Sequence, residues 1–286
     1  MSRATHDVPA RLAFAGRVAR EAGRRILEHY GVTEHVTKAG GSPVTEADLA
    51  ANRLIVESIS AEWPGEPVLA EESRDSADQR VERDLWIVDP LDGTREFLAQ
   101  NGEFAVMIGF VAGGEPVAGV VYLPARGLLY EAGSGQGAWA IDAQGNRRPL
   151  RARVADPASL RMVGSRSHPD PLLQKMQQAL HIRDVRPSGS VGVKCGLIAE
   201  AERDVYIHPV PHLKEWDTCA PEVILREAGG TVSDCLGDRL AYNKIRPDQP
   251  HGIVAAVTAV HEQVIRTVRP IYEAALRERQ ASPHEG

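Results

Sequence analysis

The stretch Leu85-Trp86-Ile87-Val88-Asp89-Pro90-Leu91-Asp92-Gly93-Thr94 carries the strongest indication of the fold. It opens with four apolar residues, which is typical of a buried strand, and then passes into two acidic residues. Gly93-Thr94 leads into Arg95-Glu96-Phe97-Leu98, so we expect a helix to begin there. A strand that ends in carboxylates and runs into a helix is typical of α/β proteins, which bind ligands at the carboxyl ends of their strands.

The N-terminal half is expected to contain two helices followed by a sheet. Apolar residues three or four apart predict a helix from about Val8 to Tyr30, and another after the N-cap residue Thr45 that ends before Pro64. Val68-Leu69-Ala70 has the composition of a short buried strand. Four further strands separated by turn residues favour an antiparallel meander, at 104–111, 116–122, 128–132 and 138–141.

After residue 150 strands alternate with helices, which predicts a second, more α/β-like half. The expected strands are 162–165, 204–207, 231–234 and 253–257, and the expected helices follow Asp170 or cover 191–200, 217–228 and 260–278. We place the change near residues 150–158, which predicts an N-terminal α+β domain of residues 1–152 and a C-terminal α/β domain of residues 153–286.

Composition excludes several classes of protein. The 286 residues are 43% hydrophobic and 25% charged with a net charge of −6, so a disordered chain and a nucleic-acid polymer as partner are not expected. The longest apolar stretch, 104–112, is far shorter than the ~20 residues that span a bilayer, so no integral membrane segment is expected. The N-terminus has no signal-peptide pattern, and three cysteines without a CxxC motif indicate reduced thiols in a cytoplasmic protein.

Further acids stand at the ends of predicted elements. Glu71 follows the strand at 68–70, Asp48 lies at the start of the second helix, and Asp217 opens a later helix. If the acids converge, each pair about 4 Å apart repels by about 4 kcal/mol at an effective dielectric near 20. Several such pairs exceed the stability of a typical domain, roughly 5–15 kcal/mol, so some acids are protonated or divalent cations lie between them. Oxygen ligands alone favour Mg²⁺ or Mn²⁺.

Gly93 and Thr94 suggest a phosphate site beside these acids, because a helix start exposes backbone N–H groups and glycine permits close approach. Each motif alone has a simpler explanation: Asp-Pro and Asp-Gly are common turn dipeptides, and an acid often begins a helix. An EF-hand is excluded because Pro90 and Leu91 stand where that loop needs oxygen-bearing side chains. The conjunction of four such features at element ends favours a phosphate bridged to metal ions.

These residues resemble a known signature. Glu71-Glu72-Ser73, the segment 89–94 and Trp216-Asp217 followed by Gly229-Gly230 are similar to the motifs of the inositol monophosphatase superfamily, over roughly residues 8–260. The resemblance implies a layered αβαβα sandwich and a Mg²⁺-dependent, lithium-sensitive phosphatase. The segments 95–97, 101–104, 165–168 and 216–222 are similar to its 3′(2′),5′-bisphosphate nucleotidase branch, which converts adenosine 3′,5′-bisphosphate, a by-product of sulfur metabolism, to AMP.

The resemblance also implies roles for individual residues. It assigns two or three Mg²⁺ ions to Glu71, Asp89, the Leu91 carbonyl, Asp92 and Asp217, with Mn²⁺ as an alternative. Thr94, hydrogen-bonded to Asp48, would orient the attacking water together with Glu71. Substrate contacts would come from the Gly93 and Thr94 amides and from His168, Ser190, Lys194, His208 and Asp217.

One departure bears on the substrate. His208 stands where inositol monophosphatases carry an acid that binds inositol hydroxyls, which argues against free inositol phosphates. Some nucleotidases have an arginine near this position for a second phosphate, and Lys194 and Lys214 could compensate here. The alternatives are an inositol monophosphate or 1,4-bisphosphate phosphatase, a sugar-phosphate phosphatase, or a binding protein that has lost catalysis. Homodimers are common in the superfamily, so a homodimer also stays open.

Overall fold

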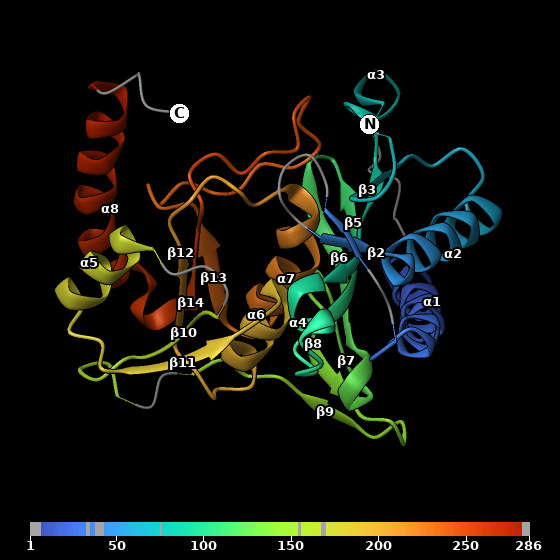
Figure 1. Cartoon of the computed structure of the whole chain (residues 1–286), viewed down its shortest axis with the longest axis horizontal. Coiled ribbons are helices and arrows are strands. Elements are labelled where there is room, and N and C mark those ends of the chain that lie inside the picture. The colour runs from blue at the N-terminus through green and yellow to red at the C-terminus, as the bar shows by residue number, and fades with distance from the viewer. Residues whose placement is uncertain are drawn as a thin grey trace.

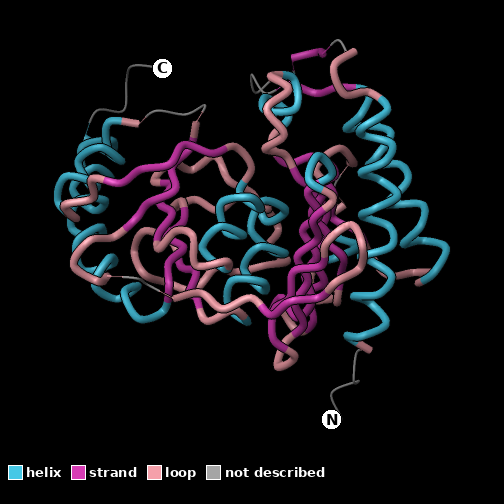
Figure 2. The backbone as a smooth tube through the Cα atoms, turned by 90° about the horizontal axis from the view of Figure 1, so that it is seen from below, coloured by secondary structure: helices cyan, strands magenta, loops and turns pink. Residues whose placement is uncertain are grey.

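Five layers of helices and sheets alternate across the molecule (Figure 1). The structure is a computed structural model that describes residues 7–32, 35–37, 43–74, 76–153, 156–166 and 170–281. Two sheets enclose a central helical layer, and further helices cover the outer face of each sheet, as Figure 2 shows from below. This arrangement confirms the expected αβαβα sandwich.

The helices of the three helical layers come from different parts of the chain. The outer layer on the N-terminal side is formed by α1 (Val8–Glu28) and α2 (Glu46–Glu62). The central layer contains α6 (Val191–Ala199) and α7 (Glu215–Glu227). The outer layer on the other side is formed by α5 (Pro171–Ala179) and α8 (Thr258–Ala281). Among the described helices none is long and apolar enough to cross a membrane.

The first sheet has seven strands in the order β3-β4-β5-β6-β7-β8-β9. All neighbours are antiparallel except β3 and β4, which are parallel, so the predicted meander is confirmed. The strands are β3 (Val68–Ala70), β4 (Leu85–Asp92), β5 (Ala105–Ala112), β6 (Glu115–Leu123), β7 (Leu128–Gly133), β8 (Gly137–Ile141) and β9 (Arg147–Pro149). Short elements beside it are β1 (His35–Thr37), which pairs with β2 (Pro43–Thr45), and α3 (Ala77–Arg80), α4 (Thr94–Leu98) and η1 (Pro124–Arg126).

The second sheet is mixed and has the order β11-β10-β12-β14-β13. Its strands are β10 (Arg161–Ser165), β11 (Asp184–Ser188), β12 (Val205–His208), β13 (Gly230–Ser233) and β14 (Ile253–Val257). The first three run parallel, and β14 is antiparallel to both of its neighbours. The strand β11 carries little apolar periodicity and was not predicted. The two sheets use residues on either side of 150–160, and the division into domains at residue 152 stays a prediction.

Most helices and strands differ from their predicted limits by a few residues, among them the first helix, α7 and β4. The first helix ends at Glu28 rather than Tyr30, with His29 as its C-cap. Helix α7 begins at Glu215, two residues early, and its third residue Asp217 accepts the backbone N–H of the N-cap residue Lys214. The strand β4 does not end at Val88 but continues to Asp92. The predicted N-cap at Thr45 is confirmed, since its side chain accepts a hydrogen bond from the Asp48 amide.

Helix α7 lies directly on the backbone of the first sheet at two glycines. A Cβ atom at Gly109 of β5 would come within 2.5 Å of Cys219 Sγ, and one at Gly119 of β6 within 2.6 Å of the Ala220 carbonyl oxygen. Side chains at these two positions would therefore push α7 away from the sheet.

All three cysteines are buried free thiols, in agreement with the expectation from the sequence.

We predict that Gly119→Ala lowers the free energy of unfolding by about 1–3 kcal/mol, because the new methyl group overpacks the α7 interface. Urea denaturation followed by fluorescence measures this loss. The control is Gly164→Ala in β10, where an added Cβ meets only Val185 Cγ1 at 3.4 Å. Equal unfolding midpoints for the two variants would contradict the close approach of α7.

Candidate functional site

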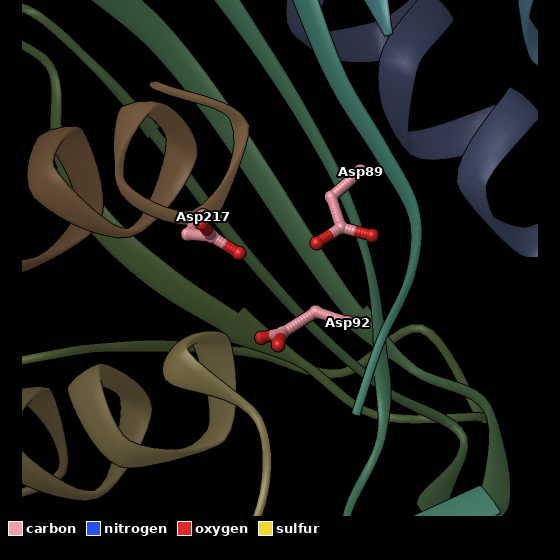
Figure 3. Close-up of side chains that lie close together, drawn as sticks. All are labelled: Asp89, Asp92 and Asp217. Carbon is pink, nitrogen blue, oxygen red and sulfur yellow. The ribbon is translucent and has the colours of Figure 1, made fainter. Parts of the chain in front are cut away.

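Asp89 and Asp92 reach the same side of the first sheet because β4 contains a bulge. In a regular strand, residues three apart point to opposite faces. Asp89 pairs with Met107 of β5 and Asp92 pairs with Ala105, so a step of three residues on β4 faces a step of two on β5. Pro90 fits the irregular segment, since its ring removes an N–H group that a regular ladder would use. The bulge turns both carboxylates toward one point (Figure 3).

The third aspartate comes from the first turn of α7. Asp217 projects from the helix toward the two aspartates of β4 (Figure 3). Its Oδ2 atom accepts the backbone N–H of Lys214 at 2.5 Å, which fixes the orientation of the carboxylate. One oxygen from each of Asp89, Asp92 and Asp217 lies within 4.8 Å of the other two. Segments separated by more than 120 residues thus contribute to one compact acidic cluster.

Hydrogen bonds from the protein also hold the two aspartates of β4. Asp89 Oδ1 accepts the backbone N–H of Leu91 at 3.0 Å. Asp92 Oδ2 accepts the Ser190 hydroxyl at 2.6 Å and the Gly192 amide at 2.9 Å, both from the start of α6. Each aspartate of the cluster therefore has one oxygen fixed by donors of the protein, so the geometry of the cluster exists before any ligand binds.

Burial and mutual repulsion make this cluster favour a proton or a cation. Burial raises the pKa of Asp89, and the charges of Glu71, Asp92 and Asp217 raise it further. Burial likewise raises the pKa of Asp217, followed by the charges of Asp92 and Glu71. The pKa of Asp92 is also raised by burial, although the Ser190 hydrogen bond and Lys194 lower it. A set of carboxylate oxygens without sulfur or nitrogen donors fits hard divalent cations.

Glu71 lies beside the compact trio. It directly follows β3, and its backbone N–H donates to the Val88 carbonyl of β4 at 3.2 Å. The parallel pairing of β3 with β4 brings it to the cavity that the three aspartates also line. Glu71 is thus placed to contribute a fourth carboxylate, although it is not part of the group within 4.8 Å.

Thr94 and Asp48 form a second pair next to the cluster. Thr94 Oγ1 lies 3.0 Å from Asp48 Oδ1 and 3.3 Å from the Leu91 carbonyl oxygen, so its proton has two acceptors. The other oxygen of Asp48 accepts both the N–H and the hydroxyl of Thr45, at 2.7 and 2.6 Å. Burial raises the pKa of Asp48, and these hydrogen bonds lower it. The contact between Thr94 and Asp48 that the resemblance implies is therefore present.

A cavity of about 610 Å³ unites most of the residues singled out from the sequence. The predicted site residues that line it are Glu71, Asp89, Leu91, Asp92, Gly93, Thr94, Ser190, Lys194, His208 and Asp217. Asp48 does not line the cavity but contacts it through Thr94. His168 lies outside the described residues. The arrangement brings ten of the twelve predicted residues to one surface.

Two basic residues lie deep in this cavity. Lys194 Nζ donates to the Gly189 carbonyl at 2.6 Å and lies 4.9 Å from the centroid of the Tyr206 ring. Burial lowers the pKa of Lys194, while the charges of Asp92 and Glu96 raise it. His208 is the last residue of β12 and is also buried. Both residues line the cavity that the acidic cluster also lines, and Lys194 is close enough to Asp92 for their charges to interact.

Sequence reasoning did not find every residue of the cavity. Buried Glu96 and the aromatic Tyr206 line it. Next to the lining residue Gly189, Glu103 accepts the Gly189 amide at 2.8 Å, and the Arg166 guanidinium binds both carboxylate oxygens of Glu103 at 3.0 and 3.1 Å. The sequence indicated Glu96, Glu103 and Arg166 only as parts of family-like segments, since their partners lie far away along the chain.

The fold and the acidic cavity are compatible with a phosphatase that uses divalent metal ions, and comparison with known proteins gives the family. The model of the inositol monophosphatase family matches residues 8–273, and the chain belongs to this family. It is 38% identical over 229 residues to the 3′(2′),5′-bisphosphate nucleotidase CysQ of Escherichia coli, covering 79% of this chain and 91% of that protein.

Other relatives carry different names. A fructose-1,6-bisphosphatase/inositol-1-monophosphatase of Thermotoga maritima is 30% identical over 271 residues, covering 92% of this chain and 97% of that protein. The crystal structure of CysQ from Bacteroides thetaiotaomicron superposes with a TM-score of 0.73 at 32% identity, covering 87% of this chain and 97% of that one. Membership of the family and the fold expected from the sequence are therefore confirmed.

We predict that Mg²⁺ raises the thermal midpoint more at about pH 8 than at about pH 5.5. Because the raised pKa values of Asp89 and Asp217 make the metal-free fold bind protons more tightly than the unfolded chain, their contribution to stability is lost as pH rises through those values. Metal ions reverse this loss at high pH. Thermal unfolding with EDTA or Mg²⁺ at both pH values measures the difference.

The variant Asp217→Asn provides the internal check. In EDTA at high pH it should melt above the wild type, because one repelling charge is gone, and its gain from Mg²⁺ should shrink. Exposed Glu57→Gln on α2 should behave as the wild type in both respects. A gain from Mg²⁺ that is the same at both pH values, or unchanged in Asp217→Asn, would contradict the repulsive cluster.

Proposed function

We propose that this protein is a Mg²⁺-dependent phosphatase that converts adenosine 3′,5′-bisphosphate to AMP and inorganic phosphate. The observation that carries the proposal is the group of three aspartate oxygens within 4.8 Å, in one cavity with Thr94 and Lys194. The similarity to CysQ, named a 3′(2′),5′-bisphosphate nucleotidase, supports the choice of substrate. A cytoplasmic role in sulfur metabolism follows from the same proposal.

The acidic residues would hold two or three ions. One ion would bind Glu71, Asp89 and the Leu91 carbonyl, and another Asp89, Asp92 and Asp217, with Asp89 shared between them. When bound, such ions lower the pKa of a water molecule and neutralise the charge that develops on the phosphate and the leaving oxygen. Mn²⁺ could replace Mg²⁺, and inhibition by Li⁺ is expected from the family.

Thr94, Asp48 and Glu71 would orient the attacking water. With its proton directed to Asp48 Oδ1, the Thr94 hydroxyl presents its lone pairs as an acceptor for a water proton. Asp48 does not line the cavity, so it positions Thr94 and does not itself receive the proton from water. Glu71 lines the cavity and is the carboxylate placed to accept a second water proton.

Gly93 would let the phosphate approach the backbone. Its φ angle is +95°, and a Cβ atom there would lie 3.0 Å from the Glu103 carbonyl oxygen, so a side chain at this position would be strained on two grounds. The Gly93 and Thr94 amides would then bind the transferred phosphate. Ser190 would act through Asp92, to which its hydroxyl donates, as well as by lining the cavity.

The basic and aromatic wall would receive the nucleoside and its second phosphate. Lys194 and His208 lie on this wall together with Lys214 and Trp216. Lys214 is ion-paired with Asp248, which partly neutralises the positive charge that Lys214 offers to a phosphate. His168 is proposed for the same region on the resemblance alone. In a bisphosphate, these basic groups would attract one phosphate and so strengthen binding, while the metal ions would hold the other phosphate.

An inositol phosphatase is the second candidate, because the Thermotoga relative carries inositol-1-monophosphatase in its name. Buried His208 argues against it, since an imidazole replaces the acid expected to bind inositol hydroxyls.

Phosphate release with Mg²⁺ tests the proposal. The panel contains adenosine 3′,5′-bisphosphate, inositol 1-phosphate, inositol 1,4-bisphosphate and fructose 1,6-bisphosphate, each with and without Li⁺. We expect kcat/KM for the nucleotide to exceed the others by at least about tenfold, which corresponds to roughly 1.4 kcal/mol of transition-state binding.

The variants Thr94→Ala and Thr94→Ser belong in the same panel. Thr94→Ala should lose about 10²–10⁴-fold in kcat, while Thr94→Ser keeps the hydroxyl and most of the activity. A preference for inositol 1-phosphate would establish the second candidate, and full activity of Thr94→Ala would remove the proposed water-orienting role.

A further inference from the structure

A segment without regular secondary structure lies against the start of α7. We call residues 240–249, between β13 and β14, the strap. Its backbone is joined to the residues just before Asp217. The Glu215 N–H donates to the Pro247 carbonyl at 2.8 Å, and the Gln249 N–H donates to the Leu213 carbonyl at 2.8 Å. Lys214 forms an antiparallel bridge with Asp248, and their side chains form an ion pair.

Glu215 makes the central contact to the strap. Its side chain is fully buried. One carboxylate oxygen accepts the N–H of Asn243 at 2.7 Å, and the other accepts the N–H of Lys244 at 3.0 Å. Lys244 Nζ lies 3.8 Å from the same carboxylate. Two consecutive amides thus need two acceptor oxygens, a requirement that a carboxylate meets and an amide side chain does not.

The strap is also joined to the N-terminal half of the chain. The Arg80 side chain is almost fully buried and donates to Asn243 Oδ1 at 3.1 Å and to the Lys244 carbonyl at 2.7 Å. Asn243 Nδ2 in turn donates to the carbonyls of Arg80 and Arg83, at 3.0 and 2.7 Å. Arg80 ends α3 in the connection from β3 to β4, the same connection that begins with Glu71.

The strap therefore connects the two segments that carry Glu71 and Asp217. Asp217 takes its orientation from the Lys214 amide, and Lys214 is held by the strap. One oxygen of Asp217 lies within 4.8 Å of oxygens of Asp89 and Asp92, so the like charges of these carboxylates act to push α7 away from β4. The buried bonds of Glu215 oppose such a movement.

We propose that Glu215 is a positioning residue of the metal centre: through the strap it fixes the first turn of α7 relative to the β3–β4 connection, and so sets the spacing between Asp217 and the acids of β3 and β4. This inference rests on the proposed metal-dependent function. Residues that orient metal ligands typically change metal affinity or activity by about 10–100-fold when they are altered.

Direct binding of Mn²⁺ to Glu215→Gln, followed by electron paramagnetic resonance, tests the role without any substrate. The amide keeps one acceptor but turns an NH₂ group toward a backbone N–H. We expect the dissociation constant for Mn²⁺ to rise by about tenfold or more. The concentration of Mg²⁺ that gives half-maximal phosphatase activity should rise in parallel, with kcat recovering at saturating Mg²⁺.

Asp204→Asn is the matched control. Asp204 is also fully buried, and it accepts the Arg161 N–H at 2.7 Å and the Arg161 guanidinium at 3.0 and 2.8 Å. It directly precedes β12, whose first residue Val205 pairs with Met162 of β10, and it does not line the cavity. This variant should lower the thermal midpoint as Glu215→Gln does, yet bind Mn²⁺ as the wild type.

If Glu215→Gln does not fold, Asn243→Gly is used as a second variant in the same Mn²⁺-binding experiment. Asn243 has a φ angle of +62°, which glycine adopts without strain. The change removes the bonds of the Asn243 side chain to Arg80 and Arg83, while the bond from Arg80 to the Lys244 carbonyl and both amides for Glu215 remain. It should weaken Mn²⁺ binding by a smaller factor. Wild-type Mn²⁺ affinity in the folded variants, or equal weakening in Asp204→Asn, would overturn the role of Glu215. A wild type that binds no Mn²⁺ would overturn the proposed function and this inference together.

Discussion

Repulsion among buried carboxylates is the constraint on which this structure depends. Asp89, Asp92 and Asp217 present oxygens within 4.8 Å of one another. Burial raises the pKa of each, and the charges of neighbouring acids in the cluster raise the pKa values of Asp89 and Asp217 further. In the metal-free protein this repulsion lowers the free energy of unfolding. A divalent cation bound between the carboxylates would relieve the repulsion, and this relief would favour its binding. The acidic net charge of the chain is therefore compatible with an anionic substrate, because the local charge of the loaded site is decided by the ions.

The fold brings these charges together by two different means. A bulge at Asp89–Asp92 turns two side chains of β4 to one side, and α7 supplies the third from the layer between the sheets. Helix α7 can lie this close because Gly109 and Gly119 present no side chain to it. The bonds of Glu215 to the strap then fix the start of the same helix. The sheet, the helix and the strap together keep the three aspartates at their short spacing, which repulsion between the carboxylates would otherwise increase.

Local sequence features predicted the elements well, and tertiary contacts explain the remainder. The capping box of Thr45 and Asp48, the meander and the acids at element ends follow from nearest neighbours in the chain. The bulge could not be predicted, because it exists only in the pairing of β4 with β5. The sequence did not single out Glu215, since its partners Asn243 and Lys244 lie nearly thirty residues away along the chain. The family motifs indicated which residues would hold metal ions, and they gave no information about what holds those residues in place.

The most direct test of the account is the location of Mn²⁺ in crystals, by anomalous diffraction at the manganese edge. The account predicts one peak enclosed by Asp89, Asp92 and Asp217, and another beside Asp89 toward Glu71 and the Leu91 carbonyl. The three aspartates should stay within the spacing found here. A cluster without anomalous density at saturating Mn²⁺, or carboxylates that turn away from one another, would contradict it.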